Sequence, residues 1–125
     1  MPEGMDHDAE VMFVNRFTVH GPAEEFEEVF ARTSAFMARQ PGFVRHRLLR
    51  ELDDPAAYVN LAVWADRASF LRAVGRPEFA PHAAALRALS RSENGLFATR
   101  LSVSGQGLED VPEGLDDPVL GVGGE

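Results

Sequence analysis

The chain has 125 residues, of which 45% are hydrophobic and 26% charged, as expected for one ordinary globular domain. It has no cysteine, which excludes disulfides, thiolate nucleophiles and cysteine-bound metals, and a cytoplasmic location is expected. All twelve basic residues are arginine, so a Schiff-base mechanism, which requires a lysine amine, is excluded as well.

The formal net charge of −8 comes from the two ends of the chain, whose acidic residues have no basic residues among them. No dense basic patch is present, so nucleic acid is not an expected partner. No apolar stretch reaches the ~18 residues that span a bilayer, so no membrane association is expected. We predict one domain over residues 10–104, an acidic tail over 1–9, and an acidic tail rich in Gly and Pro over 105–125.

The first predicted strand covers residues 10–19 (EVMFVNRFTV), which are rich in Val and Phe. Side chains alternate along a strand, so Phe13, Asn15 and Phe17 share one face. An uncharged amide within an apolar strand is costly unless it forms a hydrogen bond. Asn15 is therefore the first candidate functional residue, although an amide at a bulge or a sheet edge is the alternative.

Residues 22–39 predict a helix, because Pro22 suits the first turn and the glutamates that follow suit the positive end of the helix dipole. An apolar stripe at the helical period runs along it: Phe26, Val29, Phe30, Thr33, Phe36 and Met37. The stripe indicates a core-facing side, and part of it, including Phe30, is expected to form a pocket wall. Pro41 and Gly42 end the helix.

Residues 43–51 and 57–65 predict two further strands around a turn at Asp53-Asp54-Pro55. Four side chains of the later strand share one face at period 2: Tyr58, Asn60, Ala62 and Trp64. The Asn60 amide is suited to hydrogen-bond a phenol or carbonyl, and the Trp64 indole to stack on a fused aromatic ring. The alternative is a packed indole beside an amide that is bonded to nearby backbone.

The remaining elements are helices over 67–75 and 77–89 and a strand over 95–104. His82 lies on the apolar stripe of the second helix, where it is either a base, a ligand or an ordinary core histidine. The role of His46, which is flanked by two arginines, is left open. The histidines lack metal-site spacing, and no glycine-rich phosphate loop occurs, so no cofactor is expected.

The order β-α-β-β-α-α-β suits an α+β ferredoxin-like fold, with a four-stranded antiparallel sheet and helices on one face. The other face of the sheet carries Val59, Leu61 and Val63. A monomer rarely exposes so large an apolar patch. We therefore predict a homodimer in which two sheets pack back to back, forming a dimeric α/β barrel.

Four segments, VNRFTV, QPGF, YVNLAVW and DRASF, together with this order of elements, resemble the antibiotic biosynthesis monooxygenase domain over about residues 10–104. The chain is most similar to the cofactor-independent anthrone oxygenases of aromatic polyketide pathways, of the nogalamycin and tetracenomycin type. Those proteins carry one Asn on the first strand and Asn-x-x-x-Trp on the third. Asn15, Asn60 and Trp64 fall on these positions.

The resemblance implies a cofactor-independent monooxygenase that uses O2 to oxidise an anthrone-type polycyclic aromatic polyketide to the quinone. Asn15 and Asn60 would stabilise a carbanion-enolate, and Trp64 would hold the rings. Candidate substrate-binding residues are Tyr58, Phe70, His82 and Phe30. The related actinorhodin-pathway monooxygenase has a Tyr at the position of Phe70, so a mechanism that needs this phenol is not expected here.

Three alternatives stay open at this point. A heme-degrading or heme-binding branch of the same fold uses an Asn and a His that Asn15 and His82 match, but its Trp position falls near Ala73. The second alternative is a non-catalytic dimeric module that binds a small apolar ligand. The third is a cyclase-like or isomerase-like protein of the same pathway.

Overall fold

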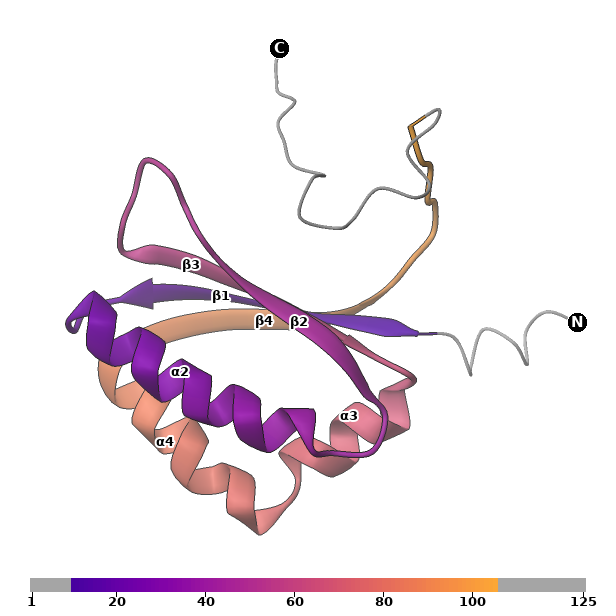
Figure 1. The fold of residues 1–125 in the computed structure, drawn as a ribbon, viewed down its shortest axis with the longest axis horizontal. Coiled ribbons are helices and arrows are strands. Elements are labelled where there is room, and N and C mark those ends of the chain that lie inside the picture. Colours follow the sequence, from indigo (N-terminus) through magenta and orange to yellow (C-terminus); the bar gives the residue numbers. More distant parts are fainter. Residues whose placement is uncertain (1–9, 106–125) are drawn as a thin grey trace, which may run out of the picture.

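The computed structural model describes residues 10–105 as a four-stranded antiparallel sheet with its helices on one face (Figure 1). The strands lie in the order β2-β3-β1-β4. The elements are β1 (Val11–Val19), α2 (Ala23–Ala38), β2 (Phe43–Arg50), β3 (Ala57–Trp64), α3 (Arg67–Val74), the short 3-10 helix η1 (Pro77–Phe79), α4 (Ala80–Leu89) and β4 (Ser90–Ala98). The predicted tails over 1–9 and 105–125 lie outside the described residues, apart from Gly105.

The larger core cluster joins α2 to the sheet. Phe26 of α2 packs against Phe17 of β1 and Tyr58 of β3, with ring centroids 5.2 and 4.9 Å apart. Phe30, one turn later, meets Phe17 edge to face at 5.8 Å. These contacts use the apolar stripe that the helical period predicted, and they hold α2 over the centre of the sheet.

A smaller cluster fixes α3 against the end of β3. The carboxylate of Asp66 caps α3 by accepting a hydrogen bond from the Ser69 backbone N–H at 2.8 Å, and this N–H lowers the pKa of Asp66. Gly42 has φ +89°, and a Cβ there would collide with the Ser69 side chain. Phe70 of the same helix meets Trp64 edge to face, with ring centroids 5.8 Å apart.

The last strand was predicted over 95–104, and this prediction is wrong. β4 begins at Ser90, directly after α4, and pairs with β1 from Val19↔Ser90 to Val11↔Ala98. Its first half is polar because β4 is an edge strand, and much of it is exposed to solvent. This shift of five residues brings Asn94 into the sheet.

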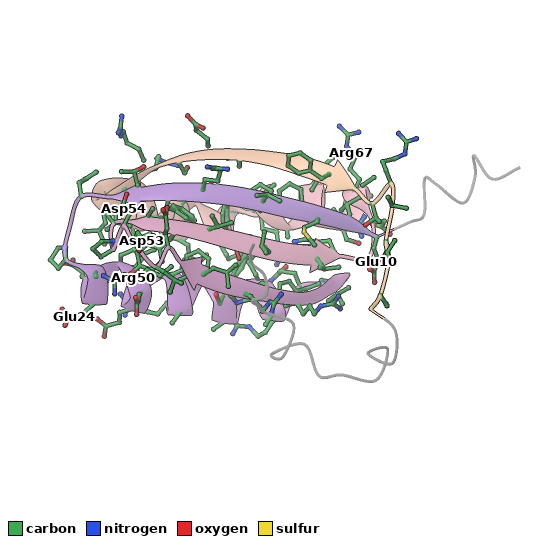
Figure 2. All side chains as sticks on the ribbon, turned by 90° about the horizontal axis from the view of Figure 1, so that it is seen from above. Glu10, Glu24, Arg50, Asp53, Asp54 and Arg67 are labelled. Carbon is green, nitrogen blue, oxygen red and sulfur yellow. The ribbon has the colours of Figure 1, made fainter. Side chains whose placement is uncertain are left out.

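The face of the sheet opposite the helices is not covered by any element within residues 10–105. Figure 2 views this face, on which the arginines Arg16, Arg45 and Arg47 alternate with apolar residues. Val59 and Leu61 are half-buried there, while Leu49 and Phe97 are exposed. Within the described range, none of the helices combines the length and hydropathy that crossing a membrane requires.

Candidate active site

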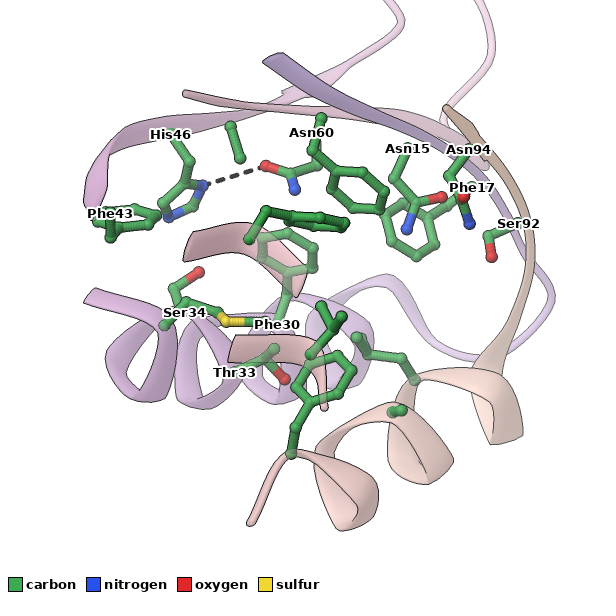
Figure 3. Close-up of a pocket in the computed structure, with 18 of the residues that line it drawn as sticks. Asn15, Phe17, Phe30, Thr33, Ser34, Phe43, His46, Asn60, Ser92 and Asn94 are labelled. Carbon is green, nitrogen blue, oxygen red and sulfur yellow. Dashed lines mark hydrogen bonds between the residues drawn. The ribbon is translucent and has the colours of Figure 1, made fainter. Parts of the chain in front are cut away.

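A cavity of about 430 Å³ lies between the inner face of the sheet and the helices (Figure 3). Its walls are mainly aromatic and aliphatic: Phe13, Phe17, Phe30, Met37, Phe43, Trp64, Phe70, Val74, Phe79 and Leu86. Pockets of this size and character hold small organic ligands. The cavity is therefore suited to a flat apolar molecule, provided that a few polar groups can orient it.

Three amides form a row across the strands on the sheet side of this cavity (Figure 3). Asn15 of β1 lies directly opposite Asn60 of β3 and, on its other side, directly opposite Asn94 of β4. The row thus has one amide on each of three neighbouring strands, which lie about 4.8 Å apart. Asn60 is only 9% exposed, whereas Asn94 is exposed, so the row leads from the interior to solvent.

His46 of β2 extends the row at its buried end. Its Nδ1 lies 3.2 Å from Oδ1 of Asn60. An amide oxygen only accepts hydrogen bonds, so the imidazole must donate through a proton on Nδ1. The ring is held between Phe30 and Phe43, whose centroids lie 5.8 and 6.0 Å away. With its oxygen engaged, Asn60 keeps both N–H groups for the cavity.

The side-chain oxygen of Asn15, unlike that of Asn60, has no hydrogen-bond partner among the described residues. This Oδ1 atom is buried. A buried acceptor without a partner costs free energy, and such groups are rare in folded proteins. The lone pairs of Asn15 are therefore available to a donor inside the cavity, such as a phenolic hydroxyl.

Trp64 forms a wall of the same cavity and is 2% exposed. Its indole meets Phe43 and Phe70 edge to face, at 5.2 and 5.8 Å. The structure thus brings five of the predicted site residues together around one cavity: Asn15, Asn60, Trp64, Phe30 and Phe70.

Tyr58 shares the strand face of Asn60 but does not line this cavity. It is buried beneath the start of α2, where its hydroxyl donates a hydrogen bond to Oε2 of Glu27 at 2.6 Å. Burial, and after it this hydrogen bond, raise the pKa of Tyr58 to about 12. Tyr58 is thus a core residue in this structure, since α2 closes over the sheet at its position.

Tyr58→Phe is expected to reduce the unfolding free energy at pH 7 by ~1 kcal/mol, the usual net value of one hydrogen bond. Because the folded-state pKa is raised, the contribution of Tyr58 is complete below pH 10 and is lost as the pH rises toward 12. The chain has one tyrosine and neither lysine nor cysteine. Urea unfolding of the wild type and of Tyr58→Phe between pH 7 and about pH 12 would test the prediction. The prediction fails if the unfolding free energies of the two proteins fall equally as the pH rises.

His82 does not line the cavity either. Its half-buried ring packs on Phe36 of α2, with centroids 5.4 Å apart. It lies on the apolar stripe as predicted, but its ring packs on α2, whereas Ala83 and Leu86 of the same stripe line the cavity. Within residues 10–105, no cluster of His, Asp and Glu has the arrangement of a metal site. The heme alternative, which relied on His82, gains no support from this placement.

Several polar residues of the cavity were not identified from the sequence, His46 and Asn94 among them. His46 had no assigned role, because the pairing of β2 with β3 that brings it to Asn60 depends on the hairpin register. Asn94 fell between the predicted helix over 77–89 and the predicted strand over 95–104, because the polar sequence around it concealed an edge strand. The alternation of Ser90, Ser92 and Asn94 with charged residues was the available signal.

Comparison with known proteins agrees with the fold and with the predicted resemblance. The family model for antibiotic biosynthesis monooxygenase matches residues 11–85. Deoxynogalonate monooxygenase of Streptomyces nogalater is 60% identical over 114 residues, which cover 91% of this chain and 89% of that protein.

Solved structures give the same result. The crystal structure of SnoaB, a cofactor-independent oxygenase from Streptomyces nogalater, matches with a TM-score of 0.75 and 65% identity, covering 76% of this chain and 97% of that one. A conserved protein from Methanosarcina mazei, 16% identical, matches with a TM-score of 0.68 over 78% of this chain and 99% of its own, and shows the fold alone. The ferredoxin-like α+β prediction is confirmed, and the chain belongs to the antibiotic biosynthesis monooxygenase family.

Proposed function

We propose that this protein is a cofactor-independent monooxygenase that oxidises the CH2 group of an anthrone-type polycyclic aromatic polyketide to the quinone carbonyl. The observation that carries the proposal is the row of amides in an otherwise apolar cavity, with the Asn15 oxygen buried and unpaired among the described residues. The similarity to deoxynogalonate monooxygenase, which is also a monooxygenase, supports the proposal.

Such a substrate supplies its own electrons. Loss of a proton from the CH2 group gives a carbanion whose charge is delocalised onto the ring oxygens as an enolate. One electron then passes to O2, and the resulting superoxide and carbon radical combine to form a peroxide. The second C–H proton leaves, the O–O bond breaks and water departs, so that one oxygen atom remains as the new carbonyl.

The cavity residues would act on the enolate stage. The N–H groups of Asn60, freed by the His46 hydrogen bond, are suited to donate to an enolate oxygen. The Asn15 oxygen is suited to accept from a neighbouring phenol. Trp64 and Phe70 would confine the rings and exclude water, which strengthens these hydrogen bonds because the effective dielectric constant falls.

Incubation of the purified protein with an anthrone under 18O2 tests the proposal. The expected product is a quinone that carries one labelled oxygen, formed faster than by spontaneous oxidation in buffer. A binding module would leave the spontaneous rate unchanged, and a cyclase or isomerase would consume its substrate without O2. Dependence of the rate on added hemin would favour the heme alternative instead.

A homodimer is part of the same proposal. Its support is the uncovered sheet face with its half-buried Val59 and Leu61 and its exposed Leu49 and Phe97, which a second sheet would remove from water. Sedimentation equilibrium would measure it, and a monomer at all concentrations would contradict it. A cytoplasmic location also remains an expectation, based on the absence of cysteine.

A further inference from the structure

The cavity wall contains one side chain with a sulfur atom, that of Met37 in the last turn of α2. Met37 is half-buried and packs against the cluster that contains Trp64 and Phe70. Ser34, one turn earlier on α2, lines the same cavity on the helix side, across from the amide row (Figure 3). The thioether therefore belongs to the part of the wall that would confine the rings of a substrate.

Packing alone accounts for a methionine in such a wall, because its flexible side chain fills irregular gaps. The chemistry of the cavity gives this one a second significance. The reaction proposed above forms a peroxide on the substrate, and peroxides convert thioethers to sulfoxides. The remaining lining groups are hydrocarbon, hydroxyl, amide, guanidinium, imidazole and indole groups, which peroxides oxidise less readily than a thioether.

We propose that Met37 is a modification site, at which the thioether accepts an oxygen atom from an aromatic hydroperoxide held in the cavity. The inference rests on the proposed function, which supplies the hydroperoxide during turnover. A sulfur lone pair attacks the outer peroxide oxygen, the S–O bond forms and the O–O bond breaks. The proton of the outer oxygen moves to the oxygen left on carbon. Sulfur loses two electrons and the peroxide gains them, so this substrate molecule leaves as the alcohol and not as the quinone.

The sulfoxide changes the cavity in which it forms. It places a polar S–O group in an apolar wall, next to the cluster of Trp64 and Phe70. Such a group is costly to bury beside an apolar ring system without a hydrogen-bond donor. Each oxidation of Met37 therefore weakens binding of the next substrate molecule, and activity falls with the number of turnovers completed.

Met12 provides an internal control. It is half-buried like Met37, but it lies opposite Val63 on the outer face of the sheet, away from the cavity. The chain has no lysine, so trypsin cleaves it only after arginine. Met37 is then the one methionine of peptide 33–39, while Met12 falls in peptide 1–16. Fragmentation of these peptides in a mass spectrometer measures the oxidation of each methionine separately.

The first experiment follows turnover with an anthrone under 18O2. Catalase and superoxide dismutase are present to remove peroxide and superoxide from solution. Met37 is expected to carry 18O as the sulfoxide, in roughly tenfold or greater excess over Met12, because reactants held in one cavity gain effective concentration. Oxidation during handling adds unlabelled oxygen and is thereby told apart. Quinone formation without label on Met37, or equal labelling of the two methionines, would overturn the inference.

The second experiment distinguishes failure of this inference from failure of the proposed function. Cumene hydroperoxide under nitrogen is an aromatic hydroperoxide, small enough for a cavity of about 430 Å³, and its use requires no oxygenase activity. Relative to H2O2, it should oxidise Met37 in preference to Met12, and anthraquinone should protect Met37 by competing for the cavity. If this holds and anthrone is not oxidised, the function is wrong and the acceptor site stands. The same ratio with both peroxides would overturn the site.

The variant Met37→Leu removes the sulfur and keeps an apolar side chain of similar volume. The rate of each protein is followed against the number of turnovers and is normalised to its own initial rate. Met37→Leu should keep its rate over more turnovers than the wild type, and Met12→Leu should lose it as the wild type does. Equal decay in Met37→Leu and the wild type would contradict the inference.

Discussion

Asn60→Ala is expected to lower kcat/KM for anthrone oxidation by roughly 10²- to 10³-fold, the usual cost of removing one preorganised oxyanion donor. The loss should appear in kcat, because the amide donates most strongly to the charge that develops on the enolate. Asn60 is 9% exposed, and its oxygen is held by His46, so the donor is oriented before substrate arrives. Steady-state oxygen consumption measures the effect.

The same experiment can determine how His46 acts. If it only orients the amide, His46→Ala costs roughly tenfold in kcat, and His46→Gln, whose side-chain N–H can donate to the same oxygen, recovers most of it. The double variant with Asn60→Ala should then be no slower than Asn60→Ala alone. Additive losses, or a pH profile that disappears with His46, would show that the imidazole acts on the substrate directly. His20→Ala, at an exposed loop position, is the control.

Phe26→Ala is expected to destabilise the fold by ~3–5 kcal/mol, the range for deleting a buried aromatic side chain. Phe26 is 0% exposed and contacts three other rings, those of Phe17, Phe30 and Tyr58. A domain of this size has ~5–15 kcal/mol of stability, so the loss removes a large part of it. Guanidinium unfolding followed by the fluorescence of Trp64 measures the change.

Leu71→Ala is the matched control, since Leu71 is 52% exposed on α3. Its cost should stay within ~0.5 kcal/mol. Where Phe26→Ala does not fold, Phe26→Leu keeps the test open, with an intermediate loss expected. A loss no larger than that of the control would mean that the cluster beneath α2 is not the main core.

Hydrophobic periodicity was sufficient for most of the fold. The strand that carries Asn15 and the strand that carries Asn60 and Trp64 were found within one residue of their observed ends, because both are central strands made mostly of apolar residues. Helix α2 was located by a stripe at the 3.6-residue period and by the Pro41-Gly42 stop. β4 was misplaced, because an edge strand exposed to water carries little hydrophobic signal.

Local sequence, through strand alternation and helical periodicity, therefore determined the class of fold and two of the amides that face the helices. Only the tertiary structure decided which side chains share the cavity. Strand register sets Asn15 opposite both Asn60 and Asn94 and brings His46 to Asn60, and it depends on pairing between distant segments. Helix docking decided the rest: α2 covers Tyr58, and the His82 ring of α4 packs on α2 outside the cavity. Burial is a property of packed layers and not of a single strand or helix.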